Sequence, residues 1–317
     1  MAALSLQSNF ASLVAQNTLT NTNSMVEQAM LRLSTGYKIN SAADDAAGLQ
    51  ISNRLELQTR GMKVAERNAN DGISLLQTAE GAFDEMTNIA YRINDLATQA
   101  ANGINGPDDF LAIDAEVSQL VEQLRQTYDT TNFGGVNLFS QGVATNDGGI
   151  FGGNGPVPLP IPPGGTGTAT PGDVVFQIGS TTEETLRFNA ATEVDNVDQV
   201  ITDLANITIS DQATAQDVMD LVQGTNGQGN NGPLANLVGD LGAVRAEFGA
   251  TINRLDSTIK NLQNMGENIS ASKGRITDAD FAVETANLTK NQLLMQAGTQ
   301  VLGQVNQLPG LALSLLR

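Results

Sequence analysis

The residue types that usually perform chemistry in proteins are scarce in this sequence. It contains no Cys and no His, which excludes thiolate nucleophiles, disulfides and the commonest general base and metal ligand. The clearest remaining candidate is the adjacent carboxylate pair Asp44-Asp45, which could bind a cation or act as an acid and a base. No other ligand type clusters beside this pair. The glycine runs also lack the Gly-Lys-Ser/Thr of a phosphate loop. We therefore expect no catalytic, cofactor-binding or metal-binding residue.

The pair has a simpler explanation in the local structure that must position it. Gly36 is placed to end one helix, and Ser41 with Asp44 three residues later has the form of a capping box,. This pattern predicts that the next helix begins at Ser41. We favour this structural interpretation, a joint between two helices, over a cation site.

Two long stretches, 62–100 and 234–269, carry mostly small or apolar residues at alternating steps of three and four, which is coiled-coil spacing,. They would span about 58 and 54 Å at 1.5 Å per residue, so they can pack side by side along their whole length. A shorter helix is predicted to open after Gly106-Pro107, with its apolar positions between Ile113 and Tyr128,. The sequence thus predicts a mainly α rod of antiparallel helices. We call its main apolar positions the seam residues: Leu76, Phe83, Met86, Ile93, Leu241, Val244, Phe248, Leu255 and Leu262.

The two ends of the chain are polar but uncharged. No charged side chain precedes Glu27, and none lies between Lys290 and Arg317. Burying the large apolar side chains of residues 1–26 would contribute about 16 kcal/mol, whereas ordering their backbone costs about 26 kcal/mol. We expect these ends to become ordered by docking against other chains, and frayed tails are the alternative.

The middle of the chain is acidic and rich in loop-forming residues. Residues 101–232 contain 17 acidic side chains and only two basic ones, which is typical of a solvated outer region. Gly and Pro dominate 140–173, and we expect only loops there and over 189–233. A short β-hairpin is predicted near 174–188. The net charge of −18 disfavours nucleic acid and anionic membranes as partners, and no apolar run is long enough to predict membrane insertion.

The stretch LRLSTGYKINSAADDAAGLQIS, residues 31–52, resembles the N-terminal signature of bacterial flagellin. The resemblance continues over about 1–139 and again over 234–317. It implies a subunit of the flagellar filament, the extracellular propeller for swimming, which is exported through the flagellar type III apparatus. The implied parts are an N-terminal filament-core helix (1–43), two halves of a coiled-coil rod domain (44–139 and 234–274), a short variable surface region (140–233) and a C-terminal filament-core helix (275–317).

The resemblance also implies partners and contact residues. Copies of the chain would form a helical homopolymer, and a flagellar export chaperone and hook-associated junction and cap proteins would bind it. The segment Tyr91–Gln99 resembles the family segment recognised by Toll-like receptor 5 of animal hosts. Arg92, Leu96 and Glu116 match the positions expected to contact that receptor. Polymerisation contacts are expected on apolar residues of the two ends: Leu6, Phe10, Leu13, Leu294, Val301, Leu315 and Leu316.

Three other functions compete with a filament subunit. A hook–filament junction protein shares the terminal patterns, although the joint motif and the full-length C-terminal match favour flagellin. Some flagellins carry a metalloprotease in the variable region, but its H-E-x-x-H zinc site cannot exist without His. A membrane-inserting translocator would need a long apolar hairpin that the sequence lacks.

Overall fold

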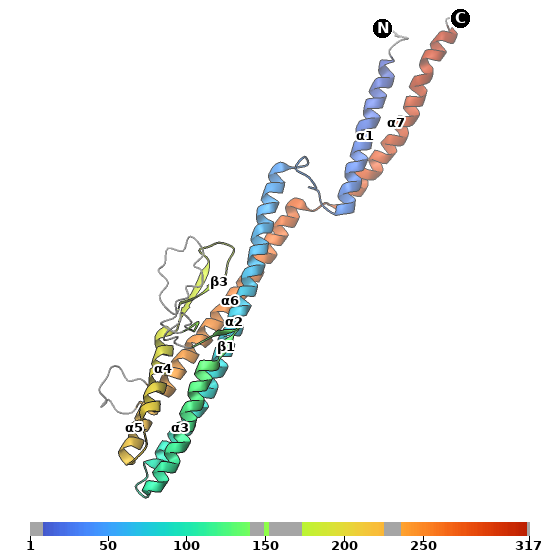
Figure 1. Ribbon diagram of the computed structural model, residues 1–317. Helices are drawn as coiled ribbons and strands as arrows, with labels where there is room; N and C mark the ends of the chain where they lie inside the picture. The colour runs from blue at the N-terminus through green and yellow to red at the C-terminus, as the bar shows by residue number, and fades with distance from the viewer. Residues whose placement is uncertain (1–8, 140–148, 152–172, 225–235, 316–317) are drawn as a thin grey trace. The chain divides into compact units, whose positions relative to one another are not determined.

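A computed structural model describes residues 9–139, 149–151, 173–224 and 236–315, with side chains up to Gln307 at the C-terminal end. The fold is mainly helical (Figure 1). The chain divides into two compact units, which are described separately. The terminal unit comprises residues 1–59 and 267–317, and the rod unit comprises residues 60–266.

The terminal unit is built on two antiparallel helices, α1 (Phe10–Thr35) and α7 (Phe281–Leu315), which lie side by side (Figure 1). Helix α1 ends at Gly36, whose φ of 76° is the left-handed conformation that glycine adopts readily,. This confirms the helix end that the sequence predicts. Helix α7 begins after Asp280, whose carboxylate accepts hydrogen bonds from the backbone N–H groups of Ala282 and Val283,.

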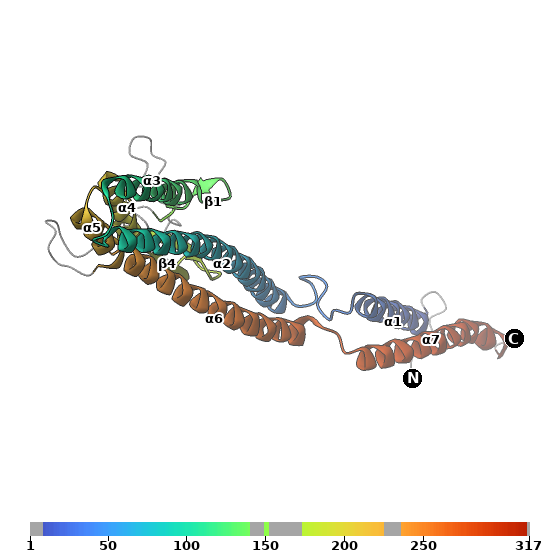
Figure 2. The same ribbon diagram turned by 90° about the horizontal axis from the view of Figure 1, so that it is seen from below.

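The rod unit is organised around two long antiparallel helices, α2 (Ala46–Ala100) and α6 (Leu237–Thr277), of which residues 60–100 and 237–266 belong to this unit (Figure 2). Polar contacts flank the apolar interior between them: Gln263 Nε2 donates to Glu66 Oε1 at 2.6 Å, and Arg245 pairs with Asp84 at 3.0 Å. All nine seam residues are buried, with at most 5% of their surface exposed. A third helix, α3 (Pro107–Thr130), opens at the Gly-Pro step.

The structure corrects one prediction about the middle of the chain. Residues 189–233 do not contain only loops, because they include helices α4 (Ala191–Asn206) and α5 (Gln212–Gln223). Both bury apolar residues at helical spacing among many Asp, Asn and Thr residues, which hid the pattern. The buried positions, none more than 3% exposed, are Val194, Val197, Val200, Ile201, Leu204, Ala215, Val218 and Val222.

Two small antiparallel hairpins accompany the helices. Strands β3 (Asp173–Gln177) and β4 (Thr185–Asn189) form the hairpin predicted near 174–188. Strands β1 (Asn132–Phe133) and β2 (Val136–Asn137) are joined by Gly134-Gly135, both with positive φ. Such a turn suits the right-handed twist of paired strands. The rest of the predicted Gly- and Pro-rich loop, apart from residues 149–151 and 173, lies outside the described residues.

An aromatic cluster joins these elements into one core. Its six rings come from α2, α3, β4, α6 and the segments around residues 139 and 151, and neighbouring ring centroids lie 4.6 to 6.2 Å apart. Such distances are typical of favourable aromatic pairs. The sequence has only 13 Phe and Tyr residues in total, so this cluster concentrates nearly half of them. Its members are Phe83, Tyr128, Phe139, Phe151, Phe188 and Phe248.

Candidate functional site

The terminal unit displays most of the exposed large hydrophobic side chains. Among the described residues, it contributes fourteen of the twenty such side chains. Phe10 is 77% exposed, and Leu13, Leu294 and Val301 are each 50 to 54% exposed. Monomeric proteins rarely leave large contiguous apolar patches in water. This surface therefore indicates burial against another protein. The buried positions of α1 hold no large side chain: Ser12, Thr22, Val26 and Ala29.

A groove of about 410 Å³ runs between α1 and α7. The Thr18 and Thr22 hydroxyls donate to backbone carbonyls of their own helix at 2.9 and 2.8 Å, so their donors are satisfied within α1. The groove is consequently an apolar surface that suits the side chains of another helix. Its lining residues are Ala11, Val14, Ala15, Thr18, Leu19, Thr22, Leu294, Ala297, Gly298, Val301 and Val305.

Neutral polar contacts join the two helices near the start of α1. Asn9 Nδ2 donates to the Val305 carbonyl at 3.2 Å, and Ser12 Oγ donates to Asn306 Oδ1 at 2.9 Å. Hydrogen bonds of this kind contribute only about 1 kcal/mol each. The described part of the buried hydrophobic cluster lies wholly in the rod unit, from Ala69 to Leu255. Helices α1 and α7, which we call the terminal pair, thus lack a large core of their own among the described residues.

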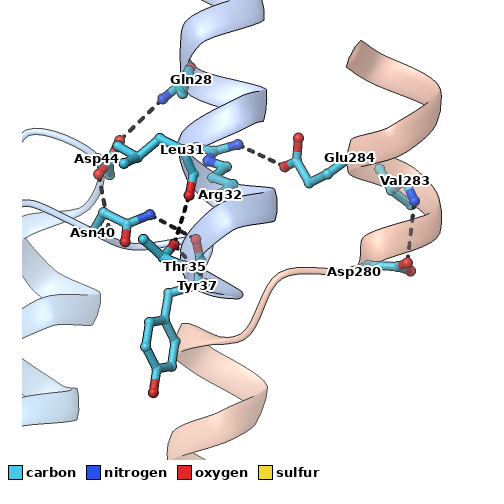
Figure 3. A network of polar contacts seen from close by, with 10 residues as sticks. All are labelled: Gln28, Leu31, Arg32, Thr35, Tyr37, Asn40, Asp44, Asp280, Val283 and Glu284. Carbon is cyan, nitrogen blue, oxygen red and sulfur yellow. Dashed lines mark hydrogen bonds and ion pairs between the residues drawn. The ribbon is translucent and has the colours of Figure 1, made fainter. Parts of the chain in front are cut away.

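At the opposite end of α1, a joint of polar contacts holds the chain where it leaves the helix (Figure 3). Arg32 Nη1 pairs with Glu284 Oε1 at 3.0 Å, and the two side chains are only 22% and 11% exposed. The backbones also pair: the Lys38 N–H donates to Thr277 at 2.7 Å, and the Ala279 N–H donates to Gly36 at 2.9 Å. These contacts tie the end of α6 and the beginning of α7 to the end of α1 and the residues that follow it.

The joint explains the carboxylate pair and corrects the predicted capping box. Asp44 accepts backbone N–H groups from Ser41 at 2.9 Å and Asn40 at 3.1 Å, and it also accepts from Gln28. These donors, Ser41 first, lower the pKa of Asp44 below its ordinary value,. Helix α2 begins at Ala46, not at Ser41, because Asp45 accepts from the Gly48 N–H and is the true cap.

Both carboxylates therefore accept hydrogen bonds from backbone N–H groups. Within the described residues, no group of three or more carboxylates could hold a metal ion.

The rod unit presents an ion pair at the predicted receptor segment. Arg92 Nη2 on α2 lies 2.6 Å from Glu116 Oε1 on α3, and the two side chains are 55% and 48% exposed. Leu96, one turn further along α2, is only 3% exposed. Arg92 and Glu116 thus form a charged ridge at the surface, with Leu96 packed in the core. We call this pair the ridge.

The predicted polymerisation residues are placed unequally. Phe10, Leu13, Leu294 and Val301 are all exposed on the terminal pair. Leu6 and Leu316 lie outside the described residues, as does the side chain of Leu315.

Sequence reasoning missed the Arg32–Glu284 ion pair, because its partners are 252 residues apart. It also missed the buried faces of α4 and α5, which a search for apolar residues at 194, 197, 201 and 204 would have found.

In the part of the chain that the structure describes, no helix combines the length and apolarity needed to cross a bilayer.

Comparison with known proteins agrees with this architecture. The family models for the bacterial flagellin N-terminal and C-terminal helical regions match residues 6–144 and 234–316. Flagellin D of Vibrio cholerae is 37% identical over 376 aligned residues, which cover 99% of this chain and 100% of that relative. Flagellin C of the same species is 38% identical over 380 residues, with the same coverage.

A solved structure described as a putative flagellar hook-associated protein from Vibrio parahaemolyticus also matches. Its TM-score is 0.51 at 14% identity, and the match covers 74% of this chain and 100% of that one. A likeness at this level of identity concerns the fold alone.

Proposed function

The chain belongs to the bacterial flagellin family, the non-enzymatic subunits of the extracellular filament that drives motility, and we propose that it enters this filament through α1 and α7. In this proposal, residues 1–43 and 275–317 form the filament core. The supporting observation is the large exposed hydrophobic surface of the terminal unit. The apolar groove between α1 and α7 would receive a helix of a neighbouring copy.

Energetics favours a second copy as the occupant of this surface. Each large apolar side chain contributes about 1.5 to 3 kcal/mol when it moves from full exposure to full burial. Among the described residues, α1 and α7 have no large core of their own, so contacts between copies would supply stabilisation that one copy lacks,. Each copy would present different surfaces to successive neighbours, and such heterologous contacts continue indefinitely as a helix instead of closing into a ring.

Hydrogen exchange tests this proposal without altering the chain. In the monomer, backbone amides of α1 and α7 should exchange rapidly, because little buried surface protects them. In polymers grown from filament seeds, the exchange rate of the same amides should fall at least about 100-fold, which corresponds to about 2.7 kcal/mol of added protection. Amides of α6 between Leu241 and Leu255 serve as the internal control, since the apolar face of this segment is already buried within one chain. Equal exchange of α1 and α7 in monomer and polymer would contradict the proposal.

We also propose that the other proteins of the flagellar apparatus use the same ends. An export chaperone would cover the exposed apolar residues of α7 before assembly, and hook-associated junction and cap proteins would contact the two ends of the filament. A junction role for this chain itself is less well supported. Its 37 to 38% identity is to flagellins over nearly the whole chain, whereas the hook-associated protein shares only 14% identity.

Finally, we propose that the ridge is recognised by Toll-like receptor 5 of animal hosts. The support is the exposure of Arg92 and Glu116 within the segment that resembles the recognised family motif. Arginine is enriched among residues that dominate binding energy, because its guanidinium makes several hydrogen bonds in one plane. Leu96 would act from beneath by keeping the ridge in place, since it is buried.

Arg92→Asp should raise the concentration of monomer that half-activates receptor-expressing cells by about tenfold or more. The fold should survive, because an exposed ion pair contributes only about 0.2 to 1 kcal/mol. Arg187→Asp is the matched control, with the same charge change at an exposed position of β4 in the same unit. If both variants activate cells as the unaltered chain does, the ridge is not the recognised surface. Circular dichroism should show equal helicity for all three proteins.

A further inference from the structure

Charge is distributed unevenly within the rod unit. The stretches 60–70 and 254–266 carry five basic and two acidic side chains. Residues 71–253 carry 24 acidic and only four basic side chains. One part of this unit is therefore positive, and the remainder is strongly negative.

The positive part contains a regular stripe on α2. Arg60, Lys63 and Arg67 are spaced three and four residues apart, which places them on one helix face,. Arg60, Lys63 and Arg67 are all exposed. Within the described part of the chain, Lys63 and Arg67 take part in no ion pair. We call these three residues the basic stripe.

The other faces of this part of α2 are already occupied. Glu66, its one acidic residue, accepts a hydrogen bond from Gln263 of α6. On another side, Asn68 Nδ2 donates to the Gln177 carbonyl of the β3–β4 hairpin at 3.1 Å. A Cβ on Gly61 would meet Ser180 Cβ at 2.7 Å, so the hairpin turn also packs closely here. The basic stripe is on the remaining face of the helix.

The complementary surface within the same chain is the α4–α5 segment. Residues 191–223 contain seven acidic side chains and no basic one. Asp203 and Asp217 are exposed. Asp198 of this segment pairs with Arg125 of α3 at 3.7 Å. Asp203 and Asp217 thus present exposed negative charge on a segment that has no basic side chain of its own.

The α5 part of the acidic surface cannot reach the basic stripe of its own copy. Helix α5 docks beside the far end of α2, where Gln223 donates to Asn94 and Thr98 donates to Met219 Sδ at 3.9 Å. Asn94 is 27 residues beyond Arg67 on the same helix, which is about 40 Å at 1.5 Å per residue. Charge attraction between exposed groups is screened within about 8 Å at physiological ionic strength. The stripe is out of reach of the α5 of its own copy.

We propose that the basic stripe docks the acidic α4–α5 surface of a second copy, displaced along the rod. This inference rests on the proposed function and adds to it a contact outside the terminal helices. The contact is heterologous, because each copy offers a stripe to one neighbour and an acidic surface to another. Complementary charges of this kind fix the register of an interface more than they increase its affinity.

The first test compares two variants of equal net charge. The stripe variant Arg60→Gln, Lys63→Gln and Arg67→Gln loses three positive charges. The control Ser74→Glu, Gln77→Glu and Thr78→Glu adds three negative charges at exposed positions of α2. Its Ser and Thr hydroxyls donate only to backbone carbonyls of the same helix. Seeded elongation should show about a tenfold rise in critical concentration for the stripe variant and less than about a twofold rise for the control.

The second test identifies the occupant of the stripe. Arg60→Glu, Lys63→Glu and Arg67→Glu should block elongation, and adding Asp203→Lys with Asp217→Lys to the same chain should restore it. Equal effects of the stripe and control variants, or no rescue by the added lysines, would overturn the inference while leaving assembly through α1 and α7 intact. If the unaltered chain itself fails to elongate on seeds, both the inference and the assembly proposal fall. Thermal melting of each variant excludes loss of the fold.

Discussion

Replacing Leu294 by Asp should nearly abolish growth of the filament while leaving the monomer unchanged. The side chain is 50% exposed and lines the groove between α1 and α7. An aspartate there remains solvated in the monomer, so the expected change in monomer stability is within about 0.5 kcal/mol. In the polymer the carboxylate would be removed from water without a positive partner, which costs several kcal/mol. We expect elongation from seeds to fall at least about 100-fold, equivalent to about 2.7 kcal/mol.

Leu13 and Val301 allow the same experiment on both helices. They are 54% and 51% exposed, and Leu13→Asp or Val301→Asp should act like Leu294→Asp. The control keeps the apolar character at the same place: Leu294→Met changes shape but little volume and should elongate within about threefold of the unaltered chain, since such swaps usually cost less than about 1.5 kcal/mol. Normal filaments from Leu294→Asp, seen by electron microscopy, would show that this groove stays open to water in the polymer.

Phe248→Ala should produce the largest loss of stability in the rod unit. The Phe248 ring is fully buried and lies 5.3 to 5.7 Å from the rings of Phe151, Phe188 and Phe83. Truncation removes these contacts and leaves a cavity, which typically destabilises a core by about 3 to 5 kcal/mol. The midpoint of guanidinium unfolding, followed by circular dichroism, should fall accordingly. The near-ultraviolet signal of Tyr128 reports the same cluster, because its ring is 5.6 Å from Phe139.

The matched control for this variant is Leu111→Ala. Leu111 lies on α3 of the same unit and is 67% exposed, so its truncation should cost less than about 0.5 kcal/mol. If Phe248→Ala lost less than about 1 kcal/mol, the aromatic cluster could not be what joins the helices and hairpins. Phe248→Leu separates the two contributions, because it refills part of the cavity without restoring the ring contacts.

The long helices of the rod unit and the joint at the end of α1 show how much local sequence patterns can predict. The alternation of steps of three and four in 62–100 predicted a long helix, because a coiled-coil interface repeats along the chain itself. Gly36 and Pro107 likewise marked a helix end and a helix start through their own backbone preferences. The cap of α2 was placed four residues too early. Asp44 and Asp45 are adjacent in the sequence. Only the folded backbone decides that Asp44 accepts a hydrogen bond within the turn before α2 and that Asp45 caps the helix.

For the α4–α5 segment, in contrast, local sequence patterns did not predict the structure. Its apolar positions are diluted by Asp, Asn and Thr residues, which favour turns when considered locally. Burial of Val194, Val197 and Ile201 against the other helices overrides that preference,. Leu96 is similar, because its match to a receptor motif gives no information about exposure. Only the packing of the other elements on α2 decides that Arg92 faces water and Leu96 does not.

The sequence by itself determined the helical rod, the uncharged ends and the flagellin family, because these depend on periodicity, composition and motifs that can be read along the chain. Only the tertiary structure decided which carboxylate caps α2, how α4 and α5 join the core, and which residues 252 positions apart meet as Arg32 and Glu284. Contacts between distant segments depend on how complete elements pack, and the identity of any single residue constrains that packing weakly.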